Sequence, residues 1–221
     1  MCIRDSVKAV NDFNLLLENG EILALLGSSG CGKTTTLRMI AGFETATSGQ
    51  IKIGERIVND LKPADRNVAM AFEGYALYPP LTVKDNIAFS LMREKISKDK
   101  VDSKVMEVAE LLEITDILER YPPSISGGQQ QRVSLARALV RDSDALLLDE
   151  PMSQLEPQLR AVLRARVKDY IQHNNKTVIF VTHDQTEAVA LADKIAVMEN
   201  GDLKQLASPV SYTHLTLPTK A

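Results

Sequence analysis

The residues that follow the apolar run Ile22–Leu26 have the types and the spacing that bind a polyphosphate. Gly27, Gly32, Lys33 and Thr34 match the pattern G-x-x-x-x-G-K-[ST], and a helical pattern follows them. Glycines allow backbone N–H groups to crowd around phosphate oxygens, and a helix N-terminus adds the positive end of its dipole. The lysine can reach the outer phosphates, and the threonine hydroxyl can ligate Mg²⁺. The predicted nucleoside-triphosphate site is the segment Gly27, Ser28, Ser29, Gly30, Cys31, Gly32, Lys33, Thr34 and Thr35.

Two carboxylates and a histidine follow two further apolar strands. Asp149 and Glu150 come directly after the apolar residues 145–148, and His183 comes shortly after the β-branched segment 177–181. A carboxylate at a strand end can hold Mg²⁺ directly or through water, as phosphoryl transfer requires. We therefore expect Asp149 to serve the metal, and Glu150 to act as the general base that polarises an attacking water.

A second glycine-containing segment, Ser126-Gly127-Gly128-Gln129, opens another helix. By itself it is equally a turn with a helix cap or a second anion-binding device. After a phosphate loop, it resembles the signature motif of ATP-binding-cassette (ABC) ATPases, with Ile125 where that family usually has leucine. The resemblance covers about residues 7–208, so it includes most of the chain.

The hydrophobic patterning gives the order of the elements that position these residues. Strands are expected at 7–17, 22–26, 49–58, 68–72, 145–148, 177–181, 195–199 and 202–205, and helices at 33–41, 82–93, from 97, 126–139 and from 157. The middle of the chain, about residues 75–140, is rich in helices and reads as an insertion into an α/β core. With the resemblance, the expected fold class is an α/β P-loop NTPase, with a RecA-like core, an antiparallel β subdomain and an ABC α-helical subdomain.

Composition limits the class of protein. The chain has 221 residues, 44% of them hydrophobic and 25% charged, and a net charge of −3, which argues against a surface for nucleic acid. It contains no apolar run of the roughly 18 residues that span a bilayer, so a membrane role has to be peripheral. Of the two cysteines, Cys31 lies inside the phosphate loop, which favours a reducing compartment over a structural disulfide.

Both ends of the chain read as foreign sequence. Residues 1–6 and 209–215 can be back-translated into reverse complements over about 17 nucleotides, which resembles a sequencing adapter and belongs outside fold reasoning. We therefore expect residues 7–208 to form the ATPase domain, with 1–6 and 209–221 non-native. The segment from 209 has no helical or strand period and is expected to be disordered.

Within the family, the chain is similar to ATPase subunits of carbohydrate importers of the maltose and glycerol-phosphate type. The similarity rests on residues 75–79 and 181–185, that is Y-A-L-Y-P and V-T-H-D-Q. It implies a peripheral protein on the cytoplasmic face of a bacterial membrane that uses ATP and Mg²⁺ to power uptake of a sugar or polyol. It also implies that His183 contacts the γ-phosphate, and that the helical insertion receives a coupling helix of the membrane subunit. A regulatory domain follows the ATPase domain in such subunits, and we expect it to be absent from this chain.

The resemblance also implies a set of partners. Two ATPase subunits, identical or different, would face each other head to tail with ATP between them. Gly27–Thr35, Asp149, Glu150 and His183 of one subunit would face Ser126–Gln129 of the other. Transmembrane permease subunits would dock on this pair, a solute-binding protein would act indirectly, and no nucleic acid would take part.

Three positions depart from the family pattern. Glu73 replaces the glutamine that contacts the metal and the attacking water, so it keeps an oxygen for Mg²⁺ but adds charge near the γ-phosphate. We expect it to retune hydrolysis while nucleotide binding is retained. Glu156 replaces a shorter aspartate in the loop that serves the partner's site, and the two changes together suggest an unequal pair of subunits. The aromatic residue that stacks on adenine lies upstream of Val7 in the family, where this chain has other sequence.

Two other functions are compatible with these motifs. The first is a soluble ABC protein of translation or repair, although such proteins carry tandem cassettes or long coiled-coil inserts, which do not appear here. The second is a hydrolysis-impaired nucleotide-binding member of a heterodimeric pair. Loss of hydrolysis on substitution of Glu150 separates an active ATPase from an inactive module.

Overall fold

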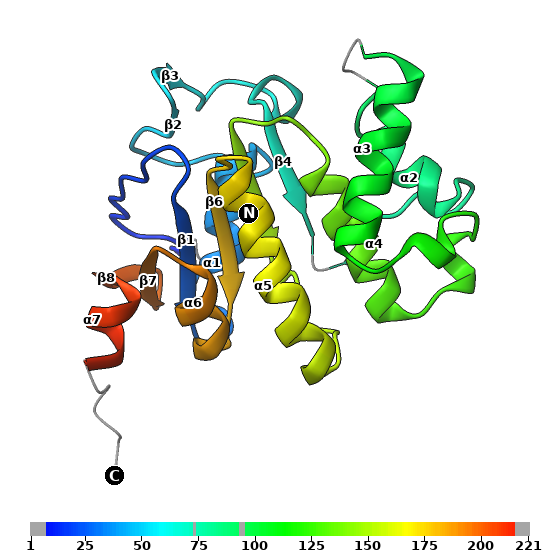
Figure 1. Cartoon of the computed structure of the whole chain (residues 1–221). Helices are drawn as coiled ribbons and strands as arrows, with labels where there is room; N and C mark the ends of the chain where they lie inside the picture. The colour runs from blue at the N-terminus through cyan, green and yellow to red at the C-terminus, as the bar shows by residue number, and fades with distance from the viewer. Residues whose placement is uncertain (1–7, 73, 93–95, 215–221) are drawn as a thin grey trace, which may run out of the picture.

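The computed structural model of the protein describes residues 8–72, 74–92 and 96–214. Along the chain the elements are β1 (Ile22–Gly27), α1 (Lys33–Ala41), β2 (Lys52–Ile53), β3 (Arg56–Ile57), β4 (Val68–Ala71), α2 (Val83–Phe89), α3 (Lys98–Leu111), α4 (Gly127–Leu139), β5 (Ala145–Asp149), α5 (Pro157–His173), β6 (Val178–Thr182), α6 (Gln185–Leu191), β7 (Lys194–Glu199), β8 (Asp202–Ala207) and α7 (Pro209–His214). Figure 1 shows a central sheet with helices on its faces and a helical lobe, α2 to α4, at one side.

The central sheet has the strand order β4-β5-β6-β1-β7-β8. Its neighbouring strands are parallel except for β7 and β8, which form an antiparallel hairpin. Strands β2 and β3 form a separate antiparallel pair. Parallel strands require crossover connections, and here helices supply most of them.

Both faces of the sheet are buried. Leu23 and Leu25 of β1 point into one apolar cluster together with Leu37 of α1. Ile22 and Ala24, the alternate residues of the same strand, point into the other cluster. A strand that is buried on both faces reads as a continuous apolar run, which is the sequence found at residues 22–26.

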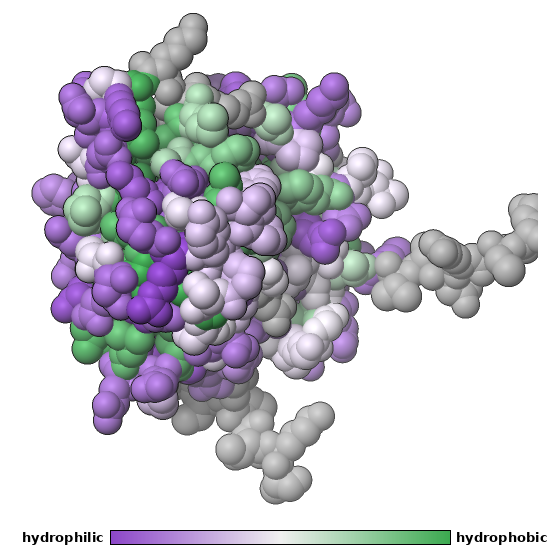
Figure 2. Space-filling view, turned by 90° about the vertical axis from the view of Figure 1, so that its right-hand side faces the viewer, coloured by the Kyte–Doolittle hydropathy of each residue, from purple (hydrophilic) through white to green (hydrophobic). Residues whose placement is uncertain are grey.

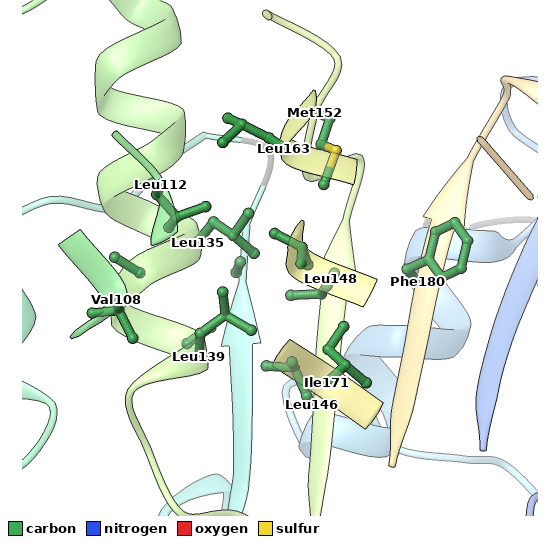
Figure 3. Packing of buried hydrophobic residues seen from close by; sticks show 14 of the residues in the cluster. Val108, Leu112, Leu135, Leu139, Leu146, Leu148, Met152, Leu163, Ile171 and Phe180 are labelled. Atoms are coloured by element: carbon green, nitrogen blue, oxygen red, sulfur yellow. The ribbon is translucent and has the colours of Figure 1, made fainter. Parts of the chain in front are cut away.

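The second cluster joins the helical lobe to the sheet. Leu135 and Leu139 of α4 lie between β5, which contributes Leu146 and Leu148, and Val108 of α3 (Figure 3). All five side chains are at most 3% exposed. Full burial of such a side chain contributes about 1.5–3 kcal/mol. Helix α4 is therefore a core element that links the helical lobe to β5 of the sheet.

The N-terminal strand prediction is wrong for the part that the structure describes. Residues 8–17 have no strand assignment, although Phe13, Leu15 and Leu17 pack against the cluster that contains α1. A turn at residues 19–20, with Gly20 at φ 81°, leads into β1 but joins no strand pair among the described residues. The alternating apolar pattern correctly indicated which side chains face inward and wrongly indicated backbone pairing.

Residues 209–214, expected to be disordered, form helix α7 instead. The Ser208 hydroxyl accepts a hydrogen bond from the Ser211 backbone N–H at 3.3 Å, as at a helix start. Tyr212 is 6% exposed and belongs to the cluster that contains α6. Burial of the Tyr212 ring packs this helix against the core, and no periodic pattern in the sequence predicted the helix. The expectations for residues 1–6 and 215–221 lie outside the described residues.

Candidate nucleotide site

Three neighbouring strands end side by side at one edge of the sheet. In the register of the sheet, Asp149 of β5 is the partner of Val181 of β6, and Thr182 of β6 is the partner of Leu26 of β1. The segments that leave these strands therefore start at the same edge. They are the phosphate loop, the pair Asp149-Glu150 and the loop that contains His183. In open α/β sheets, ligands bind at the carboxyl ends of the strands.

Steric limits at two positions explain why the phosphate loop needs glycine. A Cβ on Gly27 would lie 2.3 Å from the Met198 carbonyl oxygen. Gly32 has φ 105°, and a Cβ there would lie 2.2 Å from the Ala9 carbonyl oxygen. No larger residue fits at either position without movement of the backbone. These two glycines let the loop pack closely against the backbone of Met198 and Ala9.

Lys33 is 7% exposed and lies over the loop rather than in solvent. Its Nζ donates hydrogen bonds to the carbonyl oxygens of Gly27 and Ser28, both at 2.8 Å. The exposed part of the loop consists of Ser28, Ser29 and Gly30. These two hydrogen bonds fix the ammonium charge next to the exposed part of the loop, where a phosphate group can reach it.

Thr34 and Asp149 form a pair of oxygen ligands. The Thr34 hydroxyl donates to Oδ1 of Asp149 at 3.0 Å, and Asp149 is 5% exposed. A hydroxyl and a single carboxylate suit Mg²⁺, which takes few protein ligands and completes its shell with phosphate oxygens and water. The described residues hold no cluster of three or more His, Cys, Asp or Glu side chains that could hold a metal ion.

Glu150 and His183 meet across the ends of β5 and β6. Glu150 Oε1 lies 3.1 Å from Nδ1 of His183, whose side chain is 67% exposed. Glu150 has φ 47°, a left-handed conformation that is uncommon for a residue with a side chain. Such conformations persist only where the surrounding structure fixes them, and they are found mainly at functional sites.

Ser126–Gln129 begin α4 with a complete capping box. The Ser126 hydroxyl accepts from the Gln129 backbone N–H, and the Gln129 side chain accepts from the Ser126 N–H at 2.9 Å. Gly127 lies near the Tyr75 hydroxyl, and Gly128 lies near the Gln154 carbonyl oxygen. Ser126 and Gly127 are both exposed, so this helix start faces solvent.

Glu73 lies outside the described residues, so its predicted roles as a metal ligand and in hydrolysis stay predictions. The segment that follows it bends sharply, since Tyr75 and Ala76 both have positive φ. Arg137 of α4 donates to the Ala76 carbonyl oxygen and stacks over the Tyr78 ring, 4.9 Å from its centroid. This segment is therefore attached to the same helix that begins with Ser126.

Two residues near the site were not singled out from the sequence. Gln131 contacts the Glu150 carbonyl oxygen, and Arg160 donates to the carbonyl oxygens of Ser153 and Leu155. The signal for Gln131 was available, because it lies on the apolar stripe of α4 that includes Leu135. A polar residue on a buried stripe needs a hydrogen-bond partner, which indicates a structural or functional contact.

Glu187 is a second buried carboxyl group at the site, in addition to Asp149. It lines a cavity of about 60 Å³ that Glu150, Ser153, Arg160 and His183 also line. The Thr182 hydroxyl donates to one of its oxygens, and the other has no hydrogen-bond partner among the described residues. Burial raises the pKa of Glu187 above its ordinary value, although the Thr182 hydroxyl and the charge of Arg164 favour the ionised form.

This raised pKa predicts a pH-dependent effect of Glu187→Gln. The folded state binds the proton more tightly than the unfolded state does. The stabilising contribution of Glu187 is therefore complete below the ordinary pKa of 4.5 and is lost as pH rises through the folded-state value. The melting temperature of the variant minus that of the wild type should therefore increase between pH 5 and pH 8. Thermal melts of both proteins across this range measure the difference.

The matched control is Glu110→Gln, on the exposed side of α3. Exposed substitutions usually change stability by less than about 0.5 kcal/mol, so its melting-temperature difference should stay flat with pH. Two charged groups near Glu187 act on it in opposite directions: Arg160 lowers its pKa and Asp184 raises it. A difference for Glu187→Gln that stays constant or shrinks with rising pH contradicts the assignment.

The fold and this site together define a class of protein. A parallel sheet, a phosphate loop before α1, and Asp149, Glu150 and His183 at adjacent strand ends are the parts of a P-loop nucleotide-binding protein. The family model for ABC transporters matches residues 10–153. The chain belongs to the ABC transporter family, which confirms the expected family.

Three relatives show where in the family the similarity is strong. The chain is 50% identical over 209 residues to the trehalose/maltose import ATP-binding protein MalK of Thermococcus litoralis, covering 92% of this chain and 56% of the relative. It is 46% identical over 210 residues to the sn-glycerol-3-phosphate import ATP-binding protein UgpC of Ruegeria pomeroyi, covering 92% and 60%. It is 50% identical over 207 residues to the xylose/arabinose import ATP-binding protein XacJ of Haloferax volcanii, covering 93% and 54%. The chain thus spans little more than half the length of these relatives.

Solved structures confirm the fold class. The chain superposes with a TM-score of 0.84 and 27% identity on the ATP-binding cassette MJ0796 in a dimeric post-hydrolysis state bound to ADP and phosphate. This match covers 91% of this chain and 90% of the other. A second dimeric structure of MJ0796 matches with the same TM-score and 28% identity. In the part of the chain that the structure describes, no helix is both long enough and apolar enough to cross a bilayer.

Proposed function

We propose that this chain is the ATP-hydrolysing domain of an importer for a sugar or polyol, and that it powers uptake through partner membrane subunits. The observation that supports this most directly is the alignment of Lys33, Asp149, Glu150 and His183 at one edge of the sheet. The import names of the three relatives point the same way.

Each residue would have a separate task in hydrolysis. Lys33 and the backbone N–H groups of the phosphate loop would hold the outer phosphates. Thr34 and Asp149 would hold Mg²⁺, which neutralises charge on the phosphate oxygens. Glu150 would take a proton from the attacking water, whose oxygen forms a bond to the γ-phosphorus as the bond to ADP breaks. His183, fixed beside Glu150, would contact the γ-phosphate.

A second subunit would complete the site. Ser126 and Gly127 are exposed at the start of α4. Gly127 lies near the Tyr75 hydroxyl, and Gly128 lies near the Gln154 carbonyl oxygen. Such a helix start can donate backbone N–H groups to a phosphate of ATP bound on a partner chain. The dimers of MJ0796, which share this fold, support the same arrangement. The departures from the family pattern at Glu73 and Glu156 suggest that the second subunit is a different ATPase and not another copy of this chain.

The helical lobe would carry the membrane subunit. Tyr78, Phe89 and Met92 are 41%, 42% and 74% exposed, and the rings of Tyr78 and Phe89 lie 4.7 Å apart. Figure 2 views the side of the molecule that carries this lobe, where apolar surface interrupts polar surface. An exposed apolar patch with a polar rim is typical of an interaction site. Docking of the membrane subunit on this patch would place the protein at the cytoplasmic face of the membrane.

The test of this function has two arms. Purified protein should release phosphate from ATP with a strict requirement for Mg²⁺, and it should bind permease subunits that are encoded near its own gene. Vesicles that contain these subunits should then take up solute in an ATP-dependent manner. Phosphate release that does not depend on Mg²⁺, or that is absent in the complete complex, contradicts the proposal.

A further inference from the structure

Gln131 lies where three parts of the site meet. It is in the second turn of α4, shortly after Ser126–Gln129, and is 4% exposed. Its Nε2 donates to the Glu150 carbonyl oxygen at 2.9 Å and to the Ser153 hydroxyl at 3.1 Å. Its Oε1 accepts from the Gln154 backbone N–H at 2.9 Å. One buried amide therefore uses both its nitrogen and its oxygen to join α4, Glu150 and the loop that follows it.

These contacts bear on the conformation of Glu150. Its φ of 47° is unfavourable for a residue with a Cβ, and such a conformation persists only when the surroundings fix it. On one side of the residue, its N–H donates to the Val181 carbonyl oxygen at 3.1 Å. On the other side, its carbonyl oxygen accepts from Gln131 Nε2 at 2.9 Å and from the Ser153 hydroxyl at 3.2 Å. Both ends of the strained residue are thus held.

We propose that Gln131 is a positioning residue for hydrolysis, which holds the Glu150 backbone in the conformation that directs its carboxylate toward His183. Its hydrogen bonds go to Glu150, Ser153 and Gln154, so it acts through Glu150. Because it belongs to the helix that begins with Ser126, it also transmits movement of that helix to Glu150. The inference rests on the proposed function and deepens it. A movement of the start of α4, which would face the partner subunit, would then change the position of Glu150 in the same subunit.

The test compares two variants with a matched control. Gln131→Leu has a similar size and no hydrogen-bonding groups. Gln131→Glu keeps an acceptor for the Gln154 N–H but, when ionised, has no donor for Glu150. The control is Asn59→Ala, which removes an amide that joins the Ile51 N–H to the Gly49 carbonyl oxygen in a loop away from the strand ends.

The readouts are kcat for ATP hydrolysis, Kd for ATP and the melting temperature of each protein. Misplacing a reacting group by about 1 Å can cost about 100-fold in rate. Both Gln131 variants should therefore lower kcat by about 10- to 100-fold, with Kd within about threefold of the wild type. Asn59→Ala should lower the melting temperature and leave kcat within about twofold.

A double-mutant cycle separates positioning from general damage. If Gln131 acts through Glu150, adding Gln131→Leu to Glu150→Gln should lower the residual rate no further. Equal fold losses in both backgrounds overturn the inference, as does a kcat for the folded single variant within about threefold of the wild type. If the leucine variant does not fold, the nearly isosteric glutamate variant carries the same comparison. The unsubstituted protein tests the proposed function separately, because an inactive wild type refutes hydrolysis itself.

Discussion

Exchanging Glu150 for glutamine should lower the rate of ATP hydrolysis by about 10²- to 10⁴-fold, the usual contribution of a general base. Glutamine has nearly the same shape and can still bond to His183, which lies 3.1 Å from Glu150. However, an amide does not accept the proton of the attacking water. The groups expected to bind ATP, Lys33 and Thr34, are unchanged, so Kd for ATP should stay within about threefold. Phosphate release under single-turnover conditions and ATP titration measure the two quantities.

The control for this variant is Glu110→Gln, which removes one carboxylate from the exposed side of α3. It should hydrolyse ATP at the wild-type rate. Glu150→Gln should also accumulate an ATP-dependent dimer on size-exclusion chromatography, since the proposed sandwich opens after hydrolysis. A variant that keeps more than a tenth of the wild-type rate contradicts the role of Glu150 as the base. Weaker ATP binding in proportion to the lost rate contradicts it as well.

The phosphate loop could be predicted from the sequence because its motif residues lie within one short stretch of the chain. The steric reason for Gly27 and Gly32 could not be predicted in this way, because an added Cβ would meet the carbonyl oxygens of Met198 and Ala9, which belong to other segments. The apolar strands before Asp149 and His183 are equally local signals, and they place both residues at strand ends. What the sequence did not contain is the 3.1 Å approach of Glu150 to His183, which depends on the pairing of β5 with β6.

Contacts between distant segments account for the errors and omissions. The alternation of Phe13, Leu15 and Leu17 is that of a strand, but no strand in the described part of the chain pairs with it. The Asn11 N–H bonds instead to the Gly201 carbonyl oxygen. Gln131 contacts residues 19 to 23 positions away, which no local window includes. Helix α7 depends on burial of Tyr212 against the core, a tertiary effect that overrides weak local propensity.

The largest effect on stability is expected for Arg66→Met, which should lower the free energy of unfolding by about 3–5 kcal/mol. Arg66 is 3% exposed. Its guanidinium donates to the carbonyl oxygens of Met39 and Ile40 at 2.7 and 3.0 Å, and to those of Asn59 and Leu61 at 3.0 Å each. Methionine fills similar space but leaves these carbonyl groups without their donor, and a buried polar group without a partner is costly.

The position of these carbonyl groups connects the prediction to the nucleotide site. Two of them belong to the last turn of α1, the helix that begins at the phosphate loop, where the negative end of the helix dipole favours a cation. A Cβ on Gly42, the residue after this helix, would lie 2.6 Å from Nε of Arg66. The glycine and the buried guanidinium thus fit together to terminate α1, and the substitution should loosen the helix from its C-terminal end.

Chemical denaturation of Arg66→Met and of a surface control decides whether burial is the cause. The control is Arg56→Met, which removes an arginine from an ion pair with Asp144, 2.6 Å long and about half exposed on both sides. An exposed ion pair contributes about 0–1 kcal/mol, so this variant should unfold close to the wild type. Equal losses for the two variants would mean that Arg66 acts only through its charge. A loss of several kcal/mol at Arg66 alone attributes the effect to the four carbonyl groups that Arg66 binds, because the two substitutions remove the same charge.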